Sequence, residues 1–98
     1  MFQTLKSFTV VIASTGVAMP LVSITTPANR IDIQAAPGNA AALLVGASNI
    51  TSDSLNGGIS LSAGDVYNIE LITDLKPIYI AGTAGDKVLV NFWIGDRN

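Results

Sequence analysis

Short runs in which apolar and polar residues alternate are the feature that most restricts how this chain can fold. The clearest run, residues 87–94, places Val88, Val90, Phe92 and Ile94 at every second position. Residues 30–35 repeat the pattern, with charged or amide side chains between three apolar ones. Side chains of a β-strand point alternately to its two faces, so a period of two predicts strands and not helices.

Runs of this kind recur about every ten residues and are separated by residues that favour turns. The expected strands are 8–14, 19–24, 30–35, 39–46, 59–62, 66–73, 76–81 and 87–94. Such spacing, without a convincing helix, is typical of antiparallel sandwiches and small barrels. The chain is therefore expected to be all-β: a small antiparallel β-sandwich or jelly-roll-like domain of about seven to eight short strands.

Residues 39–46 are the ambiguous part of this pattern. Asn39 could cap a short helix that ends at Gly46. That helix would have fewer than two turns and would lie between strands, so a strand is the favoured interpretation. Whether residues 40–44 form a strand or a helical turn stays open.

The length of 98 residues corresponds to one small domain, here 1–98. Residues 1–8 are a candidate N-terminal arm. The apolar stretch after Lys6 is interrupted by Ser14, Thr15 and Gly16. It is too short and too polar to span a membrane, which takes about 20 apolar residues. We expect a soluble chain with no membrane partner.

Residues that support most enzyme mechanisms are missing or scattered. The chain has no Cys and no His, which excludes hydrolases that need either residue and metal sites built on thiolates or imidazoles. The seven acidic residues are not paired along the sequence as a glycosidase would require. The glycines at 57–58 and 82–85 precede strands, so they are interpreted as turn residues with positive φ and not as a phosphate loop. We predict that the chain is not an enzyme and has no catalytic, cofactor-binding or metal-binding residues.

The charge of the chain is low and slightly acidic. Five Lys and Arg stand against seven Asp and Glu, and charged residues make up 12% of the sequence. An acidic chain without a basic stripe is not expected to bind nucleic acid. So little charge is unusual on a freely diffusing monomer and is typical of a surface that neighbours cover.

Five apolar residues are candidates for contact with a partner. Leu89 and Trp93 lie on the face of the last strand opposite Val88 and Val90, so this strand is apolar on both sides. It lies either between two packed layers or with one face on a partner chain. Near the N-terminus, Phe2, Leu5 and Phe8 pack either on the chain's own core or, as favoured here, on a neighbour as an arm. The candidate partner-binding residues are Phe2, Leu5, Phe8, Leu89 and Trp93.

The order of short motifs along the chain carries a family resemblance. The motifs are residues 10–16, Pro20-Leu21, Thr26-Pro27, residues 30–35, Pro37-Gly38-Asn39, Leu44-Val45-Gly46, Gly58-Ile59-Ser60-Leu61, Ala63-Gly64-Asp65, residues 78–81 and residues 84–88. In their order and spacing, from about residue 10 to residue 93, the chain resembles small virion structural proteins of tailed bacteriophages, of the capsid decoration (cement) or head-fibre type. Ala40-Ala41-Ala42 departs from the family pattern, which has more polar residues here.

The resemblance implies a β-sandwich without an active site that binds the major capsid protein on the capsid surface of the virion and stabilises the phage head. It also implies a homo-oligomer, with a trimer favoured. Two alternatives remain open. One is a tail, baseplate or collar adaptor of the virion. The other is a carbohydrate-binding or adhesin-like module, in which Trp93, Tyr67 and Tyr79 would stack on sugar rings.

Overall fold

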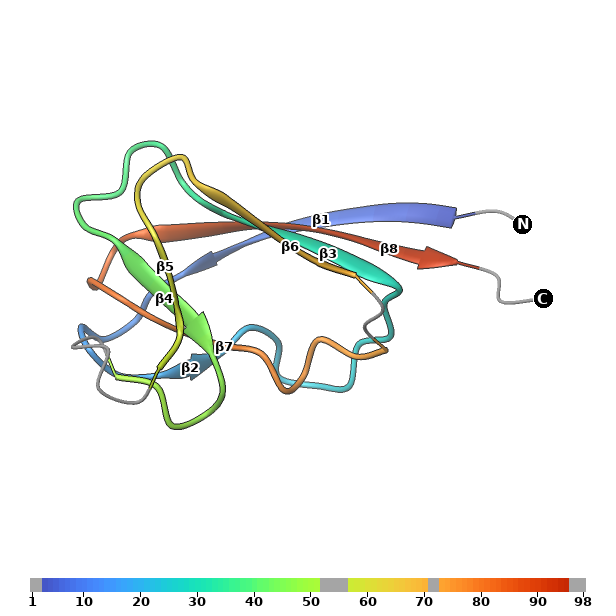
Figure 1. Cartoon of the computed structure of the whole chain (residues 1–98), viewed down its shortest axis with the longest axis horizontal. Coiled ribbons are helices and arrows are strands. Elements are labelled where there is room, and N and C mark those ends of the chain that lie inside the picture. The colour runs from blue at the N-terminus through green and yellow to red at the C-terminus, as the bar shows by residue number, and fades with distance from the viewer. Residues whose placement is uncertain (1–2, 52–56, 71–72, 96–98) are drawn as a thin grey trace.

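The computed structural model describes residues 3–51, 57–70 and 73–95, and in these residues every regular element is a β-strand (Figure 1). The strands are β1 (Gln3–Val11), β2 (Met19–Pro20), β3 (Arg30–Ala35), β4 (Leu43–Gly46), β5 (Ile59–Leu61), β6 (Val66–Glu70), β7 (Tyr79–Ala81) and β8 (Lys87–Gly95). The predicted all-β fold class is confirmed.

The strands form two antiparallel sheets of four. Sheet A has the order β1-β8-β3-β6 and sheet B the order β2-β7-β4-β5. The chain thus pairs as one long hairpin, β1 with β8, β2 with β7, β3 with β6 and β4 with β5, and successive pairs fall in alternate sheets. This is the strand order of a jelly roll.

The core lies between the inner faces of the two sheets. Ile31 and Ile33 of β3 and Val88 and Val90 of β8 are almost completely buried, and Ile80 of β7 faces them from sheet B. Burial of each such side chain contributes about 1.5–3 kcal/mol relative to exposure. The alternation of β3 and β8 therefore does what the sequence pattern predicts: it supplies one continuous apolar face to the core.

The strand boundaries differ from expectation where tertiary contacts decide them. β3 has its predicted bounds, whereas β1 begins at Gln3 and the predicted strand 19–24 is reduced to Met19 and Pro20. The described part of the candidate arm, residues 3–8, is the first part of β1 and pairs with β8. Figure 1 shows the ends of β1 and β8 extending together beyond β3 and β6.

The ambiguous stretch before Gly46 contains no helical turn. β4 begins at Leu43, and residues 40–42 approach it as an irregular segment. The carboxylate of Asp86 holds this segment: Oδ1 accepts the N–H of Ala40 at 2.9 Å and Oδ2 accepts the N–H of Ala41 at 3.2 Å. These N–H groups would otherwise belong to the first turn of a helix, so a distant side chain replaces the helix start that Asn39 suggested.

The side chain of Asn39 is used in a different way from a helix cap. Its amide donates to the carbonyl oxygen of Lys87 and accepts the N–H of Lys87, both at 2.8 Å. The amide thereby imitates the main chain of a neighbouring strand at the start of β8. Asn39 and Asp86 together attach the 36–41 turn to the 82–87 turn.

The buried carboxylate of Asp86 is expected to contribute measurably to stability. Asp86→Ala removes the acceptor of two N–H groups and should lower the free energy of unfolding by about 1.5–3 kcal/mol, because hydrogen bonds to charged groups are stronger than neutral ones. Asp86→Asn keeps one acceptor oxygen and should lose less. Urea unfolding followed by tryptophan fluorescence measures both variants, and equal losses would contradict this assignment.

Gly82 is required for close packing and not for positive φ. Gly57, Gly58 and Gly85 have positive φ as the turn interpretation expects, but Gly82 does not. A Cβ on Gly82 would lie 2.8 Å from Cδ1 of Ile12 and 3.1 Å from Cβ of Leu43. A side chain at Gly82 would therefore have to displace Ile12 and Leu43, so this glycine serves close packing and not positive φ, which corrects its interpretation as a residue with positive φ.

This close approach predicts different outcomes for two similar substitutions. Gly82→Ala should destabilise the fold by about 1–3 kcal/mol, because the added methyl group overpacks the space beside Ile12. Gly38→Ala is the matched control: it has ordinary φ and open space around its Cα, and its effect should stay within about 0.5 kcal/mol. Thermal and urea unfolding of both variants measure the difference, and equal stabilities would rule out the packing explanation.

Candidate functional site

The outer face of sheet A, which points away from sheet B, is the candidate site. Antiparallel register aligns its side chains in rows across β1, β8, β3 and β6. One row contains Leu5, Trp93, Arg30 and Glu70; the next contains Ser7, Asn91, Asp32 and Asn68; the third contains Thr9, Leu89, Gln34 and Val66. Val11 and Lys87 complete this face. An open depression of about 320 Å³ lies over residues 7–9 and 89–91.

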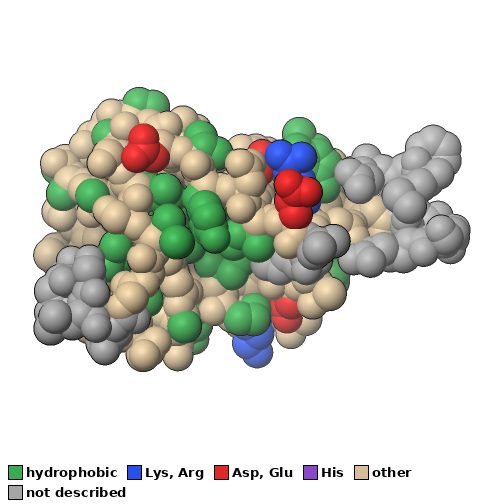
Figure 2. All heavy atoms as spheres, viewed as in Figure 1, with side chains coloured by type: hydrophobic (Ala, Val, Ile, Leu, Met, Phe, Trp, Pro, Cys, Tyr) green, Lys and Arg blue, Asp and Glu red, His purple; other side chains and the backbone are tan. Residues whose placement is uncertain are grey.

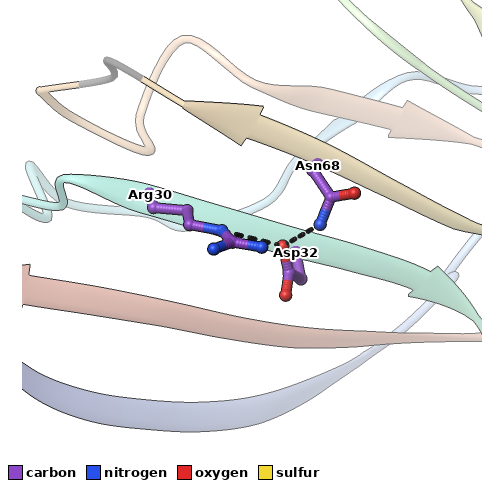
Figure 3. Close-up of polar contacts among 3 residues, drawn as sticks. All are labelled: Arg30, Asp32 and Asn68. Carbon is purple, nitrogen blue, oxygen red and sulfur yellow. Dashed lines mark hydrogen bonds and ion pairs between the residues drawn. The ribbon is translucent and has the colours of Figure 1, made fainter.

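The middle row is polar and internally bonded. Ser7 Oγ donates to Oδ1 of Asn91 at 2.5 Å, and Nδ2 of Asn68 donates to Oδ1 of Asp32. Figure 3 shows Asn68 of β6 reaching the carboxylate of Asp32, with the guanidinium of Arg30 on its other side. Nε of Arg30 lies 3.5 Å from Oδ1 of Asp32. The charge of Asp32 is therefore largely matched by groups of the same face.

Apolar side chains flank the polar row on both sides. Leu5, 54% exposed, and Trp93 lie on one side, and Leu89 and Val66, the latter 53% exposed, lie on the other. The guanidinium carbon of Arg30 is 5.0 Å from the centroid of a Trp93 ring, within the range of a cation–π contact. Two basic residues, Arg30 and Lys87, and two acidic residues, Asp32 and Glu70, give this face no net formal charge.

The structure brings together three of the five predicted partner-binding residues. Leu5, Leu89 and Trp93 share the outer face. Phe8 lies on the inner face of β1, where its ring meets Phe92 edge-on at 5.8 Å between centroids, so its side chain packs on the chain's own core. Phe2 lies outside the described residues. One face of β8 lies in the core and the other on the surface of the chain, so β8 does not lie between two packed layers. Contact of the surface face with a partner stays a prediction.

Sequence reasoning missed Val66 and Val11 on this face. Tyr67 and Ile69 alternate with polar residues and are expected to point inward, so the neighbouring Val66 points outward. An apolar residue at an outward strand position was the signal available in the sequence. Val11 was interpreted as the middle of a strand, and its 51% exposure follows from its place on the sheet margin.

Apolar side chains also gather along the open side of the sandwich, between β5 and β6, where charged side chains are few (Figure 2). Ile59 of β5 and Val66 of β6 are both exposed. Val66 belongs to the outer face of sheet A, in the row of Gln34 and Leu89.

The acidic side chains hold turns and loops together. Asp65 accepts the N–H of Ser62 and Asp86 holds the segment before β4, while Asp74 Oδ1 accepts the N–H groups of Thr26 at 2.9 Å and Lys76 at 3.0 Å. Among the described residues, no three Asp or Glu side chains lie close enough together to hold a metal ion. Neither does any helix in the described ranges have the length and hydropathy needed to cross a membrane.

The aromatic residues proposed for sugar stacking are distributed over separate surfaces. Tyr67 packs on the core from the inner face of β6, and Tyr79 packs beside Ala81 in sheet B. One side of Trp93 is occupied by Arg30. Sugar-binding sites stack ligands on adjacent exposed rings, and these three rings do not form such a platform.

Comparison with known proteins does not assign the chain to a family. No protein-family model matches it, and no curated protein matches it.

The hydrogen bonds to Asp74 predict a pH dependence of stability. The N–H groups of Lys76 and Thr26 hold the pKa of Asp74 below its ordinary value of 3.8. Because the pKa is lower in the folded than in the unfolded chain, ionised Asp74 stabilises the fold above about pH 4, and this contribution is lost as the pH falls through the folded pKa.

Asp74→Asn should therefore lower the Tm near pH 7, and the difference from the unmodified chain should shrink at acidic pH, below about pH 4. Calorimetry across this range measures the difference. A Tm difference that stays constant down to the lowest pH at which both chains fold would contradict the assignment.

Proposed function

We propose that this chain is a structural protein of a virus particle that binds the outer surface of a tailed-phage capsid and stabilises the head. The observation that carries the proposal is the outer face of sheet A, which has no net formal charge and carries Leu5 and Trp93 on one side of its polar row and Leu89 on the other. The family resemblance of the motif order supports the same function. The chain would act through binding alone, with the major capsid protein as its partner.

The physical mechanism is a shift of equilibrium by binding. A protein that binds the assembled shell and not free capsid subunits stabilises the assembled state, by an amount per site that grows with the logarithm of its free concentration relative to Kd. The apolar side chains Leu5, Leu89 and Trp93 would supply the favourable burial, and the contact of Arg30 with Asp32 offsets part of the cost of removing these two charges from water. With many copies on a capsid, each site needs only modest affinity.

The jelly-roll order itself does not distinguish this function from others, because viral coat proteins and lectins both use it. A tail, baseplate or collar adaptor would use the same face, so copy number separates it from a capsid protein. The glycan-binding alternative has less support, since Trp93, Tyr67 and Tyr79 lie on separate surfaces.

Quantitative mass spectrometry of the purified particle tests the location. We expect a fixed, high ratio of this chain to the most abundant capsid protein, on the order of one copy or more per local group of capsid subunits. A count of tens of copies or fewer per particle would instead assign the chain to the tail or collar. Absence from the particle would reject a virion function.

Substitution on the outer face tests the surface. Leu89→Arg places a charge in the third row and should weaken binding to chain-depleted capsids by about tenfold or more, the effect of losing about 1.4 kcal/mol of binding free energy. Val17→Arg is the matched control, because Val17 is 58% exposed and lies in the loop before β2. Co-sedimentation with capsids measures both after circular dichroism shows that they fold. Equal binding by the two variants would exclude the outer face as the docking surface.

A further inference from the structure

The margin of sheet A formed by β1 is long and unpaired. β1 has nine residues and lies at the end of the strand order, so in the described part of the chain it pairs with β8 alone. The other sheet margins are shorter: β2 has two residues and contains Pro20, β5 has three and β6 has five. Long edge strands without proline are templates for pairing with another strand.

The structure indicates which backbone groups of β1 are free. The N–H of Ile12 donates to Asp86, and its carbonyl accepts from Gly85, so both groups of Ile12 point toward the β8 side. Groups on an antiparallel strand alternate in direction. The N–H and C=O of Leu5, Ser7, Thr9 and Val11 therefore point away from β8, toward the open margin. The carbonyls of Trp93 and Lys87, which point to the β3 side, agree with this alternation.

The residues of β1 match a second copy of themselves in antiparallel orientation. With Phe8 on a two-fold axis, Leu5 faces Val11 of the second copy and Ser7 faces its Thr9. The backbone N–H and C=O groups of these residues point to the open margin. The two-fold axis repeats each pair, so four pairs form, and each exchanges two hydrogen bonds. Leu5 and Val11, 54% and 51% exposed in one chain, cover each other across the contact.

The inner face of the same contact is also compatible with this register. The two Phe8 rings become cross-strand neighbours, an arrangement that favours aromatic pairs. Lys6, the charged residue of β1, faces Val10 of the second copy and not another Lys6. No like charges oppose each other, and the two symmetry-related pairs of Lys6 with Val10 are the places where a charged side chain meets an apolar one.

We propose that two copies of this chain pair through β1 around a two-fold axis at Phe8, so that the two copies of sheet A form one continuous eight-stranded sheet. This inference goes beyond the proposed function and does not depend on it. An antiparallel contact of this kind uses the same patch on both copies and closes at two chains. The outer faces of both copies then form one broader surface on the same side of the joined sheet.

Sedimentation equilibrium of the full chain tests the edge contact, with a pair of substitutions at one residue. Thr9→Pro removes an N–H that points to the open margin and leaves the pairing with β8 intact, since proline is tolerated where an edge N–H faces solvent. It should raise the dissociation constant of the dimer about tenfold or more. Thr9→Ala keeps the N–H and should change it by less than about threefold. Equal effects of the two variants would overturn the proposal.

Cysteine cross-linking tests the register and stays informative if Thr9→Pro fails to fold. The chain has no Cys, so each cross-link reports an introduced pair. A mixture of Leu5→Cys and Val11→Cys chains should form mixed disulfides on mild oxidation, because facing residues of a hydrogen-bonded pair lie about 5.5 Å apart at Cα.

A mixture of Leu5→Cys and Thr9→Cys chains is the matched control, since these positions face each other only if the register shifts by two residues. Preferential cross-linking of this control would overturn the proposal. Sedimentation would overturn it as well if the chain is a monomer at all concentrations or a closed trimer, the state that the family resemblance favours. If the unmodified chain forms the dimer but does not bind capsids, the proposed function alone is rejected.

Discussion

Burial of one face of β8 and β3 against sheet B is the interaction on which the rest of the structure depends. Both strands occupy the middle of sheet A, so Ile31, Ile33, Val88 and Val90 are covered on every side. Because side chains alternate along a strand, burying this set forces Trp93, Leu89 and their neighbours to the opposite face. A shift of register by one residue would exchange the two faces, and the core could not form. The candidate surface is thus a geometric consequence of the core.

The two faces of sheet A differ in how they treat polar groups. The inner face is apolar, whereas the outer face keeps its polar groups in one bonded row, with Asp32 contacted by Asn68 and Arg30. Such a row orients its side chains before any partner arrives, which reduces the entropy that binding must overcome. Leu5, Leu89 and Val66 stand beside it without competing for its hydrogen bonds.

Polar side chains also decide how the turns join the sheets. Asp86 and Asn39 connect the turn before β4 with the turn before β8, and Asp74 connects the loops that carry Thr26 and Lys76. The contacts of Asp86 with Ala40, Asn39 with Lys87 and Asp74 with Thr26 join residues 46 to 48 positions apart in the sequence. Their role could not be predicted from the sequence, because Asp and Asn are ordinary turn residues wherever they occur. Only the fold shows which distant N–H groups they face.

The sequence by itself determined the fold class, most strands and the two faces of the last one, because a period of two is a local property of a few residues. It placed Leu89 and Trp93 on the face opposite Val88 and Val90, and only the structure shows which of the two faces is buried. The tertiary structure decided the rest. It extended β1 back to Gln3 by pairing it with β8, placed Phe8 on the core and Leu5 on the surface, and replaced a helix start at Asn39 with the carboxylate of Asp86. It also made Gly82 a packing residue beside Ile12. These outcomes depend on which distant segments become neighbours, and local patterns carry no information about that.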